Sequence, residues 1–126
     1  MGFDWKLYIR LSDELITHQR DRKLKKAYLR TALSRYYYGV YGLACNLIKS
    51  EGITLPPIDK HKFVRNYYNY SSDFVRRKIG SNLSRLWKRR INADYDENAK
   101  IDMNEARTSQ NYAIASLKTL SRIGLK

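Results

Sequence analysis

Hydrophobic positions recur at helical spacing along almost the whole chain, and this pattern predicts an all-α protein. The first expected helix spans residues 4–17, and its inner face carries Trp5, Tyr8, Leu11 (or Ile9), Leu15 and Ile16. A long second helix, residues 23–50, contains the run from Tyr36 to Cys45, which is apolar or aromatic on all sides, as is typical of a central, buried helix. Gly39 and Gly42 would let another backbone approach this helix closely, and Gly52 would end it in a left-handed conformation.

A loop and two further helices are expected in the middle of the chain. Residues 53–57 form the loop, because two adjacent prolines cannot continue a helix. Asp59 can cap a third helix that begins near Lys60. A polar break at residues 69–73 then offers an N-cap for a fourth, basic helix that runs to about Ile91, and the candidates for this cap are Ser71, Ser72 and Asp73.

The last expected helix follows a polar loop over residues 94–101. Asp102 and Glu105, three residues apart, form the capping-box signature of a helix start. The expected inner face of this helix carries Ala106, Tyr112 (or Ala113), Ala115 (or Ser116), Leu117 and Leu120. The connections are short and no repeat is present, so residues 1–126 are expected to form one domain, an up-and-down bundle of four to five helices.

Composition agrees with a packed helical domain. The chain has 126 residues and 43% hydrophobic residues, and a chain of this length buries roughly two thirds of its unfolded surface. Its one cysteine, Cys45, lies in an apolar run and is expected to be a buried thiol in a reducing compartment. No segment approaches the roughly 20 apolar residues that cross a bilayer, so we expect a cytoplasmic protein without membrane contact.

Positive charge is large and clustered. The chain carries 25 basic and 12 acidic residues, a formal net charge of +13, which attracts polyanions at long range. Residues 74–93 contain no acid and seven basic residues, which are Arg76, Arg77, Lys78, Arg85, Lys88, Arg89 and Arg90. A solvated surface or a partner with an acidic patch is the alternative interpretation, but the clustering favours nucleic acid.

Arg90 differs from the other basic residues of this segment because it falls on the apolar stripe. The stripe consists of Val75, Ile79, Leu83 and Leu86, and Arg90 is its next position. An unpaired buried ion costs on the order of several kcal/mol, and Asp94 lies one helical turn further on, within reach of the guanidinium. Two interpretations follow: a buried pair that ends the helix with Tyr95 packed beneath it, or an Arg90 that faces a cleft and binds a phosphate.

Conventional catalytic and metal-binding motifs are not found in the sequence. The two histidines, His18 and His61, fall in different expected helices, and no HExxH, CxxC, Gly-rich phosphate loop or G-x-S-x-G motif occurs. We therefore expect no metal and no cofactor. His61 follows a helix start, where capping or packing is more typical than catalysis, and Trp87 fits either the core or a stacking surface.

Two segments, together with the position of a histidine, resemble the HEPN superfamily, the small α-helical domains of bacterial and archaeal toxin–antitoxin and defence systems. Residues 34–41 (Ser-Arg-Tyr-Tyr-Tyr-Gly-Val-Tyr) look like the S-R-A-Y-Y-A-x-F run of many short HEPN proteins. Residues 83–95, which end in Arg-x-x-Ala-Asp-Tyr, look like their C-terminal signature. Residues 61–64 (His-Lys-Phe-Val) lie where such proteins often carry a histidine that opens a helix. The order and spacing agree over residues 4–122.

The resemblance implies a four- or five-helix bundle that forms a homodimer. In active members, an arginine and a histidine in an R-x4–6-H motif meet in a cleft at the dimer interface and cleave RNA without metal, through attack of the 2′-hydroxyl on the adjacent phosphate. Arg90 matches the motif arginine, but the residue five positions on is Tyr95 instead of histidine. A phenol, with an ordinary pKa of about 10, is a poor base at neutral pH, whereas an imidazole, with a pKa near about 6.5, is well matched. Asp94 is a weak base if it pairs with Arg90.

Two functions are expected from this resemblance and from the charge. The first is a metal-independent endoribonuclease of a toxin–antitoxin or antiphage system, in which Arg90 binds the scissile phosphate, Asp94 orients Arg90, and Tyr95 contacts phosphate or ribose. The RNA backbone would be held by Arg76, Arg77, Arg85, Lys88 and Arg89, with His61, Arg35 and Tyr38 as accessory residues. The second is a non-catalytic module that binds RNA or a partner such as a nucleotidyltransferase-type antitoxin. A third and weaker alternative is an all-α structural dimer with incidental charge.

Overall fold

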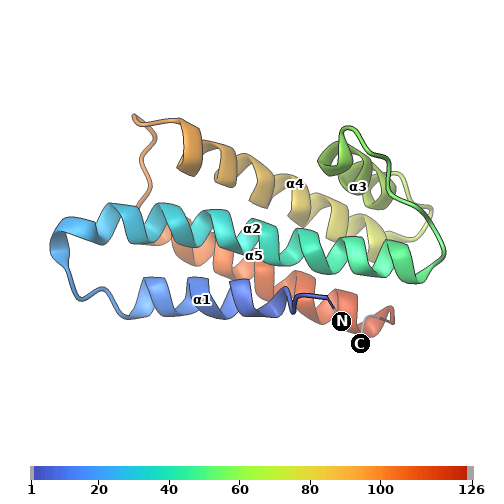
Figure 1. Ribbon diagram of the computed structural model, residues 1–126, viewed down its shortest axis with the longest axis horizontal. Coiled ribbons are helices and arrows are strands. Elements are labelled where there is room, and N and C mark those ends of the chain that lie inside the picture. The colour runs from blue at the N-terminus through green and yellow to red at the C-terminus, as the bar shows by residue number, and fades with distance from the viewer. Residues whose placement is uncertain (1, 125–126) are drawn as a thin grey trace.

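The computed structural model describes residues 2–124, and residues 1, 125 and 126 of the expected domain lie outside this range. Every regular element within the described range is helical. The five α-helices are α1 (Lys6–Thr17), α2 (Lys25–Ser50), α3 (Lys60–Asn69), α4 (Phe74–Tyr95) and α5 (Met103–Arg122), and a short 3-10 turn, Arg22–Leu24, precedes α2. Figure 1 shows that the four long helices alternate in direction and that the short α3 lies beside α4. The expected all-α bundle is confirmed.

Helix α2 is the centre of the bundle. It packs against α1, α4 and α5, and its buried side chains include Leu33, Tyr36, Tyr37, Val40 and Ile48. The prediction of a helix buried on most sides is therefore confirmed. None of the helices in the described range combines the length and the apolar character that crossing a membrane requires.

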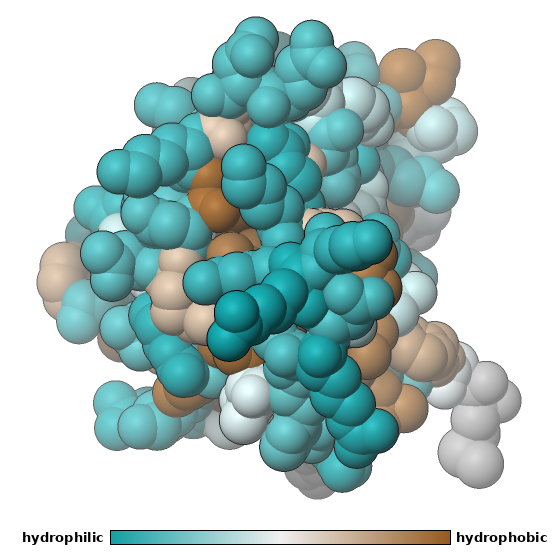
Figure 2. Space-filling view, turned by 90° about the vertical axis from the view of Figure 1, so that its left-hand side faces the viewer, coloured by the Kyte–Doolittle hydropathy of each residue, from teal (hydrophilic) through white to brown (hydrophobic). Residues whose placement is uncertain are grey.

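The end of the bundle at the left of Figure 1 carries the α1–α2 link and the α4–α5 loop. Viewed from that side, the surface is mostly hydrophilic, with apolar spots between the polar side chains (Figure 2). The link and the first turn of α2 contribute a group of exposed cations, which are Arg20, Arg22, Lys23, Lys25 and Lys26. Its single acid, Asp21, accepts a hydrogen bond from the backbone N–H of Lys23 at 2.9 Å and caps the 3-10 turn.

Two glycines of α2 allow the N-terminal segment to approach closely, as the sequence predicted. A Cβ atom at Gly42 would overlap the indole ring of Trp5, and one at Gly39 would lie 2.7 Å from Cγ1 of Ile9. Gly52 has a φ of 83°, so it provides the left-handed position after the end of α2.

Helix starts agree with the sequence at two of three positions. Asp73 accepts a hydrogen bond from the N–H of Val75 at 3.0 Å, and Asp102 accepts one from the N–H of Glu105 at 3.0 Å. The expected cap at Asp59 is wrong, because this residue adopts a left-handed conformation (φ 56°, ψ 40°) and its side chain bonds no amide of α3. The first turn of α3 is therefore left without a side-chain cap.

The inner faces of α1 and α5 differ from the hydrophobic pattern because serines occupy buried positions. Ile9 and Ser12 face the core in α1, whereas Leu11 is 44% exposed. The hydroxyl of Ser12 donates to the carbonyl of Ala32 at 2.8 Å, so a small polar residue ties α1 to α2 at a close crossing. In α5, Ser109 and Ser116 are also buried, but Ser116 donates to the carbonyl of Tyr112 in its own helix, at 2.7 Å. Of the alternatives offered by the sequence, Ala113 and Ser116 face inward instead of Tyr112 and Ala115.

Helix α4 differs from the expectation at both ends. It continues to Tyr95, past the expected end near Ile91, and this extension brings Asp94 onto the helix one turn after Arg90. Val75, the first member of the expected apolar stripe, is 37% exposed, because the core begins one turn later, at Ile79.

The contact between Trp5 and Gly42 predicts a context-dependent effect on stability. Gly42→Ala should lower the free energy of unfolding by about 1–3 kcal/mol, because the new methyl group has to displace the indole ring. In a Trp5→Ala background the same substitution should instead stabilise the protein, by about 1 kcal/mol at most, because alanine favours the helix and the three atoms nearest to its methyl group, all in the indole, are absent. Urea unfolding followed by circular dichroism measures both values, and an equal effect in the two backgrounds would contradict the packing described here.

Candidate nucleic-acid interface

Arg90 takes part in the ion pair that its helical position predicted. Its Nε lies 2.9 Å from Oδ2 of Asp94, and the Arg90 side chain is only 14% exposed. The same carboxylate oxygen accepts a hydrogen bond from the hydroxyl of Ser34 on α2, at 3.1 Å. Ser34 in turn accepts a hydrogen bond from Nη2 of Arg35, at 3.1 Å. Asp94 is therefore held between α2 and Arg90.

A series of alternating rings and guanidiniums connects α1, α2 and the end of α4. The Arg90 guanidinium carbon lies 5.1 Å from the ring centre of Tyr38 and 5.3 Å from that of Tyr95. Arg35 lies 4.8 Å from the ring centre of Tyr38 and 4.9 Å from that of Tyr8. Distances of this kind are typical of cation–π contacts. Arg35 and Tyr38, expected as accessory residues, thus belong to the immediate surroundings of Arg90.

Tyr95 is exposed at the end of this series. Its side chain is 72% exposed, so the interpretation that it packs beneath the Arg90–Asp94 pair is wrong. The reason is its place in the last turn of α4, on the solvent side. Its hydroxyl accepts a weak hydrogen bond from Nη2 of Arg90, at 3.4 Å.

A groove of about 590 Å³ lies between the start of α3 and the second half of α4. Its lining contains four cationic side chains, one carboxylate, His61 and two aromatic rings; these residues, with Ile91, are Asp59, Lys60, His61, Lys62, Arg65, Trp87, Arg90 and Tyr95. The guanidinium of Arg65 lies 4.2 Å from the ring centre of Trp87. Trp87 is half-buried, so one part of its indole packs on the core and another carries this cation.

His61 enters the groove with a defined protonation state. Its Nδ1 lies 2.6 Å from the hydroxyl of Tyr37, and its ring stacks on Tyr41 with 4.1 Å between the ring centres. Burial lowers the pKa of His61 below its usual range, and the nearby charges of Arg90 and Arg65 lower it further. The imidazole is therefore neutral at neutral pH.

The partner of His61 determines which ring nitrogen carries the proton. Burial raises the pKa of the Tyr37 phenol well above its usual range, so the hydroxyl keeps its hydrogen. Tyr37 is fully buried, and Nδ1 of His61 is its hydrogen-bond partner within the described residues. We therefore assign Tyr37 as the donor and Nδ1 as the acceptor, which places the imidazole hydrogen on Nε2. In this tautomer His61 can donate to an anion.

The five residues expected to hold an RNA backbone do not line the groove. Arg76 forms a two-point contact with Glu51, at 2.6 and 2.9 Å, and Nη1 of Arg77 donates to the carbonyl of Ser71 at 2.9 Å. Arg85 and Arg89 both lie 5.4 Å from the ring centre of Tyr112 on α5, and Arg89 also pairs with Glu105 at 3.2 Å. Lys88 is exposed. The helix therefore carries its charge in several directions, and two of the five cations are neutralised by acids.

The groove residues that the sequence analysis missed come from α3. Lys60, Lys62 and Arg65 supply three of its four cations. A signal for them was present, because Arg65 follows His61 by one helical turn and the two lysines flank this histidine. Arg30, the other residue missed, precedes Ser34 by one turn on α2 and reaches the end of α4.

Neither a metal cluster nor a known relative assigns a role to this groove. Within residues 2–124, no three His, Cys, Asp or Glu side chains lie together in a way that could hold a metal ion. Comparisons of the chain with protein-family models, with curated proteins and with solved structures found no match.

Proposed function

We propose that this chain is a HEPN-like RNA-binding protein that holds the phosphodiester backbone of single-stranded RNA in the groove between α3 and α4. The observation that carries the proposal is the excess of positive charge in one concave site, where the four cations Lys60, Lys62, Arg65 and Arg90 outnumber the two acids, Asp59 in the lining and Asp94 beside Arg90. Contacts to phosphate supply most of the affinity of proteins for nucleic acid, and a net charge of +13 would steer RNA toward the surface.

Arg90 is prepared for an anion before one arrives. Asp94 engages Nε and Tyr95 engages Nη2, whereas Nη1 donates to none of the described residues. An arginine held in this way loses little conformational entropy on binding. The uncapped start of α3 borders the same groove, and its free amides and helix dipole also favour negative charge.

Exposed rings make single-stranded RNA a better fit than a duplex. Tyr95 presents a 72% exposed ring next to the phosphate-binding cations, and an unpaired base can stack on such a surface. A ring at this position has no comparable partner in a continuous duplex, whose bases are stacked on one another.

Cleavage of the bound RNA is a second candidate function, and His61 favours it. The histidine expected five residues after Arg90 is replaced by Tyr95, but α3 brings an imidazole into the same groove as Arg90. Transphosphorylation needs a base that accepts the proton of the 2′-hydroxyl and an acid that donates a proton to the departing 5′-oxygen. In the tautomer set by Tyr37, His61 has no free lone pair facing the groove, and Asp94 already has two partners. Binding is therefore better supported than catalysis.

The wider biological setting rests on the resemblance. Membership of a toxin–antitoxin or antiphage system, a homodimer, a nucleotidyltransferase-type partner and a cytoplasmic location are the properties that HEPN-like proteins would share with this chain. They remain predictions.

Arg90→Ala should weaken binding of a fluorescently labelled single-stranded RNA by roughly tenfold or more, because a charge-assisted contact of about 1.5–3 kcal/mol is lost. The RNA affinity of Arg90→Lys should lie between those of the wild type and Arg90→Ala, since lysine keeps the charge but not the planar guanidinium. Fluorescence anisotropy at fixed salt gives the Kd values. Arg10→Ala, which removes the same charge from the exposed side of α1, is the matched control and should change the Kd little.

Equal losses in the Arg90 and Arg10 variants would refute the proposed groove. The same RNA, incubated with EDTA and separated on a gel, tests cleavage. Intact RNA supports the binding function, whereas products that disappear in both His61→Gln and Arg90→Ala would establish the endoribonuclease.

Binding should also depend on pH through His61. In the free protein the pKa of His61 is lowered, so the imidazole is neutral at pH 7. It gains a positive charge only when the pH falls below the usual pKa range of a histidine. A bound phosphate favours that charge, and RNA affinity should therefore rise as the pH decreases from about 7.5 to about 5.5. His61→Gln should flatten this dependence, whereas His18→Gln should leave it in place. A dependence that persists without His61 would exclude this imidazole as its source.

A further inference from the structure

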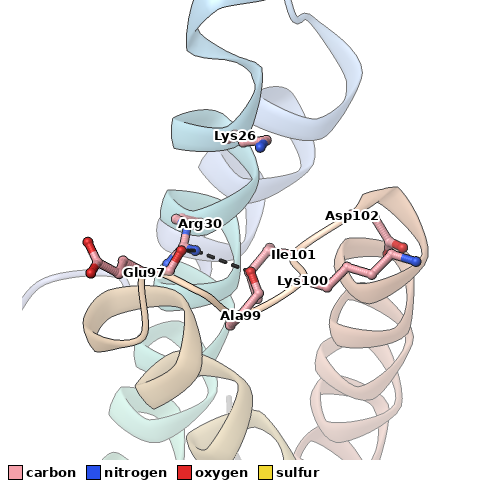
Figure 3. Close-up of a pocket in the computed structure, with 7 residues that line it drawn as sticks. All are labelled: Lys26, Arg30, Glu97, Ala99, Lys100, Ile101 and Asp102. Atoms are coloured by element: carbon pink, nitrogen blue, oxygen red, sulfur yellow. Dashed lines mark hydrogen bonds between the residues drawn. The ribbon is translucent and has the colours of Figure 1, made fainter.

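The guanidinium of Arg30 on α2 donates to five backbone carbonyls at the end of α4 and in the loop that follows. Nη1 donates to the carbonyls of Asn92 at 3.4 Å, Ala93 at 2.9 Å and Asp96 at 2.9 Å. Nη2 donates to the carbonyls of Glu97 and Ala99, each at 3.3 Å. Figure 3 shows Arg30 beside this loop, with one of these bonds drawn.

Two of these carbonyls, those of Asn92 and Ala93, belong to the last turn of α4, and the other three belong to the loop. The end of a helix carries the negative end of its dipole, and its last carbonyls lack partners within the helix, so a cation is favoured there. A guanidinium offers five N–H groups in one plane, whereas an ammonium offers three around a point. Arg30 therefore does for the end of α4 what a C-terminal cap would do, and it also gathers the loop around a single centre.

The carbonyls that Arg30 holds lie on both sides of the residues that hold Arg90. Asp94 and Tyr95 stand between Ala93 and Asp96, whose carbonyls form the two shortest bonds, at 2.9 Å each. One turn further along α2, Ser34 donates to Asp94. Arg30 and Ser34, on consecutive turns of α2, thus fix the backbone at the end of α4 and the carboxylate of Asp94, which pairs with Arg90.

We propose that Arg30 is a positioning residue for Arg90: it holds the last turn of α4 so that Asp94 and Tyr95 keep the Arg90 guanidinium in the groove. The effect on RNA rests on the proposed function, whereas the effect on the position of Arg90 does not.

A cavity beside Arg30 makes the proposal testable by chemical rescue. It has a volume of about 300 Å³ and is lined by Lys26, Arg30, Glu97, Ala99, Lys100, Ile101 and Asp102. In Arg30→Ala, this opening would let a free guanidinium ion reach the vacated carbonyls. Lys26→Ala is the matched control. Lys26 lines the same cavity, but its ammonium group makes no bond to these carbonyls.

The first measurement is independent of RNA. NMR follows the Arg90 Nε–H signal and the exchange of the amide hydrogens of Asp96 and Ala99, which donate to Asn92 and Asp96 at 3.1 and 3.2 Å. In Arg30→Ala the Arg90 signal should shift and both amides should exchange at least tenfold faster, while the amide of His18 at the end of α1 stays unchanged. Guanidinium chloride well below unfolding concentrations, but not sodium chloride of equal ionic strength, should reverse the changes. Lys26→Ala should show none of them.

The second measurement uses a double-mutant cycle on RNA affinity. Arg30→Ala should weaken binding in the wild-type background but have no further effect in an Arg90→Ala background, because its influence passes through Arg90. The loss of RNA affinity in Arg30→Ala should add to the loss in Lys62→Ala, because Lys62 contributes to binding independently of Arg90. If Arg30→Ala does not fold, Arg30→Lys, which keeps a charge with fewer donors, takes its place and should show the same pattern at smaller size.

Distinct results would overturn each proposal. An unchanged Arg90 signal in a folded Arg30 variant, or losses that simply add in the Arg30 and Arg90 cycle, would refute the positioning role. If Arg90→Ala leaves RNA affinity unchanged, the proposed function fails, and the NMR result alone then decides whether Arg30 positions Arg90.

Discussion

The burial of α2 is the constraint on which the rest of the structure depends. A helix surrounded by others cannot leave polar side chains unpaired, because an unsatisfied buried polar group costs about 1–3 kcal/mol. The buried hydroxyl groups of α2 therefore meet specific partners: Tyr36 bonds to Asp13 of α1 at 2.5 Å, and Tyr37 bonds to His61 of α3. Ser34 and Arg30 bond to the end of α4. These pairs define how the neighbouring helices are placed, and apolar packing alone would not give the same precision.

The same pairs assemble the candidate site. One wall of the groove is α3, whose His61 is fixed by Tyr37, and the other is α4, whose Arg90 is fixed through Asp94 by Ser34. One stretch of α2, from Ser34 to Tyr37, thus anchors a residue on each wall of the groove. A site built on packed helices holds its geometry better than one built on loops, and this favours recognition of a fixed group such as phosphate.

Charge has two different roles in this molecule. Along α4, Arg76 and Arg89 are paired with Glu51 and Glu105, so they join helices and add little to the external field. In the groove, Lys60, Lys62 and Arg65 lie near Arg90, and the acids nearby are Asp59 in the lining and Asp94, which pairs with Arg90. Like charges held together in this way repel one another, and a bound anion would relieve that repulsion. This difference, more than the total charge, separates a binding surface from a solvated one.

The sequence by itself determined the features that depend on neighbours along the chain. The helical class, the buried centre of α2 and the cap at Asp102 follow from spacings of a few residues, which local geometry converts directly into contacts. Spacing also brought Asp94 within reach of Arg90 and offered Asp73 as one of three candidate caps, and the structure selected both. Only the tertiary structure decided which distant residues meet. The approach of α3 to α4, the five carbonyls around Arg30 and the neutral state of His61 depend on how the helices rotate and pack, and no periodicity records that rotation. The buried serines show the same limit, since hydrophobicity marks a core face only where the close approach of two helices does not demand a small polar residue.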